Sequence, residues 1–196
     1  IKMGMIDLFE DYRIIGGFRF PVNFNNTEYM LSYENLKSRM DKKYLVSRQS
    51  FTRNAQSGNA QKIQTYDAKY NLKFPFNEVA SLRLTSSVRY DRIVTLSTEP
   101  ATLEIENENH YLAGIKLDYV FDNTRTIGLN ILNGTRFKVW GEFYREADKA
   151  ETDFFVFGLD FRHYQKIHRN IVFATRAAAS TSIGHQRLLN YLGGVD

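Results

Sequence analysis

Residues 153–164 read DFFVFGLDFRHY, and their side chains change character at every second position. The even positions include the charged residues Asp160 and Arg162. The odd positions are large and apolar: Phe155, Phe157, Leu159 and Phe161. Successive side chains of a β-strand point to opposite faces of the sheet, whereas helical side chains repeat every 3.6 residues. The segment therefore predicts a strand with one apolar face and one polar face.

The same period of two recurs along the chain and predicts about nine strands. Their ranges are 12–20, 28–39, 44–53, 62–74, 79–96, 109–121, 134–146, 152–164 and 169–181. Strands of soluble domains centre on about five or six residues, and most of these are longer. A tilted strand of about ten residues can cross the hydrocarbon layer of a bilayer. We therefore predict an all-β, antiparallel up-and-down meander that forms a transmembrane β-barrel or part of one.

In such a barrel the apolar face meets lipid and the charged face lines a hydrated lumen. The side chains predicted to face lipid are Phe137, Val139, Phe143, Phe155, Phe157, Leu159 and Phe161. The charges predicted to line the lumen are Lys116, Asp118, Lys138, Glu142, Asp160, Arg162 and Arg176. Charges inside a barrel must pair or be hydrated, so the alternative to a direct functional role is a ladder of ion pairs between strands.

Composition excludes several classes of protein. No stretch approaches the eighteen or more apolar residues of a membrane-spanning helix, which excludes a helical membrane protein. The chain has no cysteine, so disulfides, thiol catalysis and thiolate metal sites are excluded together. Its 26 basic and 22 acidic residues are intermixed, and this pattern does not indicate nucleic-acid binding. The start of the chain has no apolar segment typical of a secretory signal.

Short and long connections alternate between the predicted strands. The short ones lie near 40–43, 75–78 and 165–169. The long polar ones lie near 21–28, 52–61, 97–109 and 145–153. Every other turn of a meander lies at the same end of the sheet, so this pattern predicts the short periplasmic turns and longer extracellular loops of outer-membrane barrels. Residues 122–133 are the exception, because they form a long connection at the short-turn end.

Two other classes of protein remain open. A soluble β-barrel or sandwich that binds a ligand or a protein would place Phe155, Phe157 and Phe161 in a closed core. A membrane-barrel lipase would need a serine beside a histidine, and residues 179–185 contain both types. His163 and His168 are five residues apart without a carboxylate between them, which does not fit a zinc motif. We therefore predict no enzyme activity, no metal and no cofactor.

The long connection at 122–133 carries a cluster of turn-forming residues. Its motif consists of Asp122, Thr124, Arg125, Gly128 and Gly134. Asp122 can accept hydrogen bonds from backbone amides, and Gly128 and Gly134 can adopt positive φ. Arg125 can pair with a carboxylate such as Asp118 or Asp122.

This motif resembles a periplasmic turn of the bacterial surface antigen family, the outer-membrane barrels of BamA and TamA type. Residues 157–184 resemble the next hairpin of that family, and 191–196 resemble the glycine-rich approach to a later barrel segment. The chain is most similar to the version in Bacteroidetes, in which a TolB-like propeller precedes the barrel. It differs from the family pattern at Thr126, where a proline usually follows the arginine.

The resemblance implies a location in the outer membrane of a Gram-negative bacterium and a function in outer-membrane protein assembly or transport. It also implies that the partners are the lipid bilayer and a periplasmic or envelope protein. On this interpretation residues 1–196 form a single barrel domain that is incomplete at both ends.

Overall fold

All regular secondary structure in the described part of the chain is β-strand. The structure is a computed structural model that describes residues 1–20, 26–54, 60–96, 106–128, 131–147, 152–168 and 171–185. Within these ranges, no helix has the length and apolar character needed to cross a membrane.

The described ranges contain eleven strands, which follow one another along the sequence. The first six are β1 (Lys2–Ile6), β2 (Tyr12–Arg19), β3 (Glu28–Asn35), β4 (Asp41–Asn54), β5 (Ala60–Pro75) and β6 (Ala80–Leu96). The others are β7 (Glu108–Asp122), β8 (Arg125–Gly128), β9 (Ile131–Glu146), β10 (Phe154–His168) and β11 (Ile171–Gly184).

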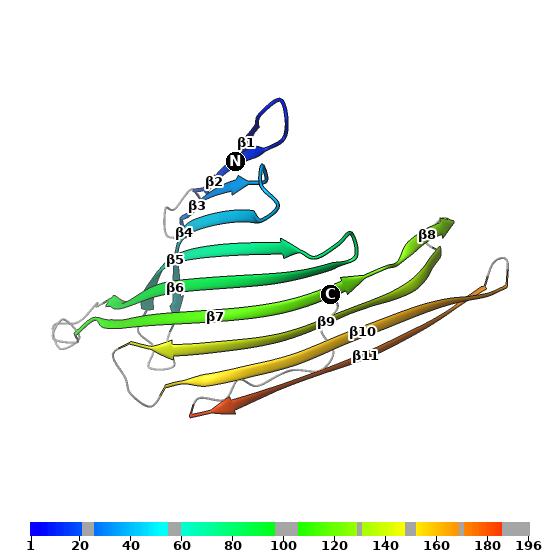
Figure 1. Ribbon diagram of the computed structural model, residues 1–196. Coiled ribbons are helices and arrows are strands. Elements are labelled where there is room, and N and C mark those ends of the chain that lie inside the picture. The colour runs from blue at the N-terminus through cyan, green and yellow to red at the C-terminus, as the bar shows by residue number, and fades with distance from the viewer. Residues whose placement is uncertain are drawn as a thin grey trace. The chain divides into compact units, whose positions relative to one another are not determined.

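The strands form a meander in which almost every strand pairs with its neighbours in sequence (Figure 1). The strand order is β1-β2-β3-β4-β5-β6-β7-β9-β10-β11, and β8 lies off this path and pairs with β9. Strands β4 to β7 and β9 to β11 have 14 to 17 residues each. The predicted all-β antiparallel meander is therefore confirmed.

Each of the nine predicted strands is present, but two short strands are missing from the prediction. The first, β1, has five residues and contains Gly4, so its alternation is too short to recognise. The second, β8, lies inside the connection predicted as one long turn. Arg125 pairs with Asn133 and Thr126 with Leu132, so β8 forms a hairpin with the start of β9.

By their packing the residues form two units, which are described separately. The first comprises Ile1–Asn71, Ser86–Gly114 and Glu146–Ala150. Two rows of tyrosines cross its strands. One row, with ring centroids 4.9–6.4 Å apart, contains Tyr12, Tyr33, Tyr44 and Tyr70. The other contains Tyr66, Tyr90 and Tyr111, and Arg48 joins it to Tyr29.

The second unit comprises Leu72–Thr85, Ile115–Arg145 and Glu151–Asp196. It contains β9, β10 and β11, whose register is continuous along the whole central part of β10. Phe161 pairs with Phe137 on one side and with Ala177 on the other.

Burial is inverted relative to a soluble domain, because more polar than apolar side chains are buried in the described residues. The buried apolar residues are Ile63, Ala80, Phe154 and Val156. The buried polar ones are Ser32, Ser50, Thr65, Ser81, Asp118, Glu146 and Thr152. Soluble domains ordinarily bury their large apolar residues and leave charged ones exposed. Here many large apolar side chains are exposed instead, on both units.

Candidate functional site

The second unit carries the two predicted sets of side chains on opposite faces of β9 and β10. Residues paired across an antiparallel ladder point to the same side of the sheet. Phe155 pairs with Phe143, and Leu159 pairs with Val139, which places these apolar residues on one face. Asp160 pairs with Lys138, which places these charges on the other face. We call the first the phenylalanine face (Phe137, Val139, Phe143, Phe155, Phe157, Leu159, Phe161) and the second the charged face.

The charged face contains two ion-pair clusters, and the first connects β7 with β9. Lys116 forms an ion pair with Glu142, whose other carboxylate oxygen accepts a hydrogen bond of 2.8 Å from the Tyr144 hydroxyl. Asp118 is only 6% exposed. The Nζ of Lys138 lies 3.1 Å from its Oδ1, in an ion pair that lacks hydrogen-bond geometry. Two lysines on neighbouring strands thus neutralise two carboxylates.

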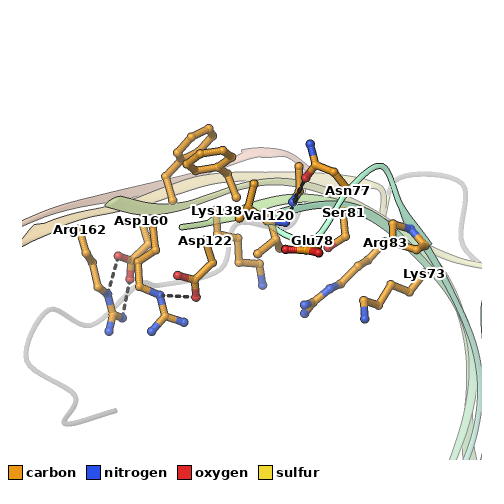
Figure 2. A pocket seen from close by; sticks show the side chains of 16 residues that line it. Lys73, Asn77, Glu78, Ser81, Arg83, Val120, Asp122, Lys138, Asp160 and Arg162 are labelled. Carbon is orange, nitrogen blue, oxygen red and sulfur yellow. Dashed lines mark hydrogen bonds and ion pairs between the residues drawn. The ribbon is translucent and has the colours of Figure 1, made fainter. Parts of the chain in front are cut away.

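The second cluster connects β10 with β11 around Asp160. Arg162 donates two hydrogen bonds of 2.9 Å to this carboxylate, one to each oxygen (Figure 2). Arg176 donates a third, 2.8 Å long, from the adjacent strand. All seven charges predicted to line the lumen therefore take part in ion pairs between or along strands.

Between the two clusters, Trp140 packs against Gly158, its partner in the register of β9 and β10. A side chain at Gly158 would overlap the indole ring. The ammonium groups of Lys116 and Lys138 lie 5.9 and 5.3 Å from the ring centroid, within the range of cation–π contacts. Sequence reasoning did not find this contact. The only signal was a glycine interrupting the large residues of β10.

The turn motif after β7 is built around Asp122. Its Oδ1 accepts hydrogen bonds from the Thr124 amide, at 3.1 Å, and from the Thr124 hydroxyl, at 2.6 Å. Gly134 has φ of +123°, and a Cβ there would approach the Asn123 carbonyl oxygen to 2.8 Å. These two residues thus hold the turn as their sequence predicted.

Two expectations about the same motif are wrong. Gly128 is not among the described glycines with positive φ, because it ends β8 in extended conformation next to Ile131. Arg125, the exposed first residue of β8, forms no ion pair with the residues that the structure describes. The ion-pair partner of Asp122 is Arg136 on β9, with 3.5 Å between Nε and Oδ2.

A cavity of about 500 Å³ lies on the charged face beside this turn (Figure 2). The turn between β5 and β6 closes one side of it. Asn77 shapes that turn by accepting hydrogen bonds from the amides of Val79, at 3.0 Å, and Ala80, at 2.7 Å. The amide of Asp122 donates to the Val79 carbonyl, at 2.7 Å, and ties the turn to β7.

The cavity is more basic than acidic. Three carboxylates line it, those of Glu78, Asp122 and Asp160, and five basic side chains do so. Figure 2 shows Lys73 and Arg83 extending from the same side of the sheet as Arg162. The sequence analysis did not single out Lys73, Glu78 or Arg83, because only the folding of β5 and β6 brings them to this face. In the ranges that the structure covers, no cluster of three metal-ligating side chains occurs.

A comparison with solved structures found a protein with a similar fold. The chain is similar to the crystal structure of BamA from Haemophilus ducreyi lacking POTRA domains 1-3. The TM-score is 0.64 at 16% sequence identity, over 95% of this chain and 39% of that chain. The fold is that of a BamA-like β-meander. No family model matches the chain, and no curated protein matches it either.

This likeness agrees with the resemblance found in the turn motif, and it concerns the fold alone. The chain spans well under half of the BamA chain that it matches. The Bacteroidetes version, the upstream propeller and the single domain over residues 1–196 remain predictions from the sequence.

Proposed function

We propose that this chain is part of an outer-membrane β-barrel that takes part in outer-membrane protein assembly or transport and has no enzyme activity. The phenylalanine face would contact lipid, and the charged face would line a hydrated interior. The observation that carries the proposal is the inverted burial, with apolar side chains exposed and charges buried or paired on the opposite face.

The exposed positions argue against a soluble sandwich. That alternative requires Phe155, Phe157 and Phe161 to be enclosed in a core, yet their exposed fractions in the described structure are 41%, 49% and 37%. Water would have to solvate this whole apolar stripe, at a cost of about 25 cal/mol for each Å² of apolar surface. A lipid environment removes that cost.

Aromatic residues bracket an aliphatic segment on β7, as expected for a strand crossing a membrane. Tyr111 and Tyr119 are eight residues apart, and the exposed Ile115 and Leu117 lie between them on the same face. Eight residues of a strand rise about 26 Å. At a tilt near 40° this is about 20 Å along the membrane normal, comparable with the roughly 25 Å apolar band of outer-membrane barrels. Tyr66 and Phe74 on β5 have the same spacing.

The assembly or transport function rests on two separate similarities. One is the overall fold shared with BamA, and the other is the turn motif that resembles the surface antigen family. We propose that the turn around Asp122 and the neighbouring basic cavity face the periplasm and meet an envelope protein there. The Bacteroidetes version with its TolB-like propeller is the form of the family that we expect.

Insertion into vesicles tests the membrane proposal. The chain is refolded from urea in the presence of phosphatidylcholine vesicles, and protease protection and β-structure are measured. We expect protected strands that remain with the vesicles at high salt. A stable, monomeric folded chain in buffer without detergent would overturn the proposal.

A second measurement separates assembly from transport. Vesicles containing the chain are mixed with an unfolded eight-stranded outer-membrane barrel, and the rate of its insertion is compared with that in empty vesicles. Faster insertion supports assembly. Release of a trapped small solute without faster insertion supports transport, and neither effect would contradict both functions.

A further inference from the structure

In the described strands of the first unit, every charged residue on one face is basic. This tyrosine face is the side of β2 to β7 that carries Tyr29, Tyr33, Tyr44, Tyr66, Tyr70, Tyr90 and Tyr111. Its charged residues in the described strands are Lys42, Arg48, Lys62 and Arg92. The acidic residues of the same strands alternate onto the opposite face: Glu28, Glu34, Asp41, Asp67, Asp91 and Glu108.

The ion pairs of this unit follow that separation. Lys43 pairs with Glu34, at 2.7 Å, and Lys69 pairs with Asp67, at 2.9 Å, all on the face opposite the tyrosines. Within the described residues, no carboxylate forms an ion pair with Arg48, Lys62 or Arg92. On their own side of the sheet, the described strands therefore supply no carboxylate to these three cations.

Arg48 is held in place but not neutralised. Its guanidinium carbon lies 5.2 Å from the ring centroid of Tyr29 and 5.3 Å from that of Tyr66. One guanidinium nitrogen donates a hydrogen bond of 2.5 Å to the Tyr29 hydroxyl, whereas the buried Nε has no hydrogen-bond partner in the described structure. Two neutral rings thus orient a partly desolvated cation. Such a group gains most from an anion that accepts several of its N–H groups.

Lys62 and Arg92 lie on β5 and β6, the two strands that follow β4 in the sheet. Tyr66 stacks on Tyr90, at 5.9 Å between ring centroids, and Arg92 follows Tyr90 by two residues on the same face. Strands β4 and β6 are separated only by β5, which corresponds to about 10 Å between their backbones. Long arginine side chains can converge over that distance. Lys62 and Arg92 also lie toward the strand ends that adjoin the connections predicted to be long.

We propose that Arg48, Arg92 and Lys62 bind the phosphate monoester of a membrane lipid. The proposal rests on the proposed function, because it requires the tyrosine face to meet the bilayer. A phosphate monoester carries up to two negative charges and three acceptor oxygens, enough to engage two guanidinium groups. The row of Tyr66, Tyr90 and Tyr111, which Arg48 contacts, would lie at the level of the headgroups, where phenol rings are favoured. The acyl chains would then lie along the apolar residues farther along the strands.

Lipid binding by the full chain tests this site. The chain is inserted into neutral detergent micelles and titrated with phosphatidic acid, with phosphatidylglycerol and with inorganic phosphate, and bound lipid is measured by native mass spectrometry. We expect phosphatidic acid to bind at least about fivefold more tightly than either of the others, because both the charge and the acyl chains contribute.

Substitutions on the two faces give a matched comparison. Arg48→Gln is expected to weaken phosphatidic acid binding about tenfold, and Arg92→Gln about threefold to tenfold. Arg48→Lys keeps the charge but loses the planar fork, so it should recover only part of the affinity. Arg53→Gln is the control, since Arg53 lies at the same end of β4 on the opposite face and changes the net charge equally.

The outcomes separate this proposal from the proposed function. A chain that inserts normally but loses no more lipid affinity with Arg48→Gln or Arg92→Gln than with Arg53→Gln overturns the lipid site alone. Equal binding of inorganic phosphate and phosphatidic acid also overturns it. A wild-type chain that does not insert at all overturns both proposals. If Arg48→Gln fails to insert, Arg92→Gln decides, because Arg92 is exposed and its loss breaks no described ion pair.

Discussion

The two faces of β9 and β10 have the same backbone pairing but are stabilised in opposite ways. On the charged face, Asp118 and Asp160 are neutralised by cations from neighbouring strands. On the phenylalanine face, Phe157 and Leu159 remain exposed and have little protein to pack against. On the charged face, side chains of the sheet itself neutralise the charges. On the phenylalanine face, the stability of the sheet depends on the medium that contacts the exposed apolar side chains. The difference indicates that the stability of this fold depends on what surrounds the phenylalanine face.

The largest effect on stability is expected when a charged residue is placed on the exposed phenylalanine face. Leu159→Arg places a cation in the middle of β10, where a lipid-facing charge costs about 2–4 kcal/mol near the bilayer centre. We expect the free energy of unfolding in vesicles to fall by that amount, measured by urea titration.

Gln165→Arg is the matched control, because it lies on the same face near the end of β10, where the cost is about 0–1 kcal/mol. Equal effects at both positions would show that the face does not span a bilayer.

A smaller effect on stability is expected when a bulky side chain replaces Gly158 beside Trp140. Gly158→Val would overlap the indole and force it off the strand, at a cost of about 1–3 kcal/mol. The unfolding free energy should fall, and the fluorescence of the protein's one tryptophan should shift.

The double variant with Trp140→Ala provides the control. If the overlap is the cause, valine should cost much less in that background, and the two substitutions should be strongly non-additive. Additive effects would mean that Gly158 is needed for the backbone of β10 and not for the indole.

On the charged face, removal of the Asp160 charge tests whether its ion pairs stabilise the sheet. Arg162 pairs in register with both Arg136 and Arg176, so Asp160→Asn leaves a row of like charges. The expected loss is about 1–2 kcal/mol, between that of an exposed ion pair and that of a buried charged hydrogen bond. Because salt screens repulsion, the loss should be larger at 0.01 M than at 0.15 M ionic strength.

Asp67→Asn is the comparison for this experiment, since Asp67 pairs with Lys69 on β5, and the row of arginines is on β9, β10 and β11. A loss at Asp160 that does not depend on salt would point to packing instead of charge.

The smallest expected effect concerns which arginine stabilises the turn after β7. Arg136→Ala removes a partly exposed ion pair with Asp122 and should cost about 0.2–1 kcal/mol. Arg125→Ala should change the unfolding free energy by less than that, because Arg125 has no ion pair in the described residues. Both are measured by urea unfolding in vesicles, and a reversed order would contradict the pairing seen in the structure.

The sequence was sufficient for the strands and their faces because alternation is a local property. Residues 153–164 already separate Phe157 and Leu159 from Asp160. Contacts between strands could not be derived in the same way, because they depend on register. The pairs Trp140–Gly158 and Asp122–Arg136 each join two strands. The sequence of neither strand determines the register between them.

The same reason explains the missed strand β8 and the missed cavity residues. The four residues of β8 are too few to show a period, and they become a strand only by pairing with β9. Lys73 and Arg83 are ordinary charges in the sequence and become neighbours when β5 turns into β6. The tyrosine rows likewise join residues from as many as five strands.

The pairing of each long strand with the next one along the chain also bears on how the protein can fold. Every such pairing closes only the short stretch between two consecutive strands, so the entropy lost at each step is small and rises only with the logarithm of its length. Sheets dominated by distant pairings fold slowly, whereas a meander can grow one hairpin at a time. The insertion of β8 between β7 and β9 lengthens one of these closures. The longest connection between paired strands is 97–107, so we expect the pairing of β6 with β7 to be the slowest step in the growth of the sheet.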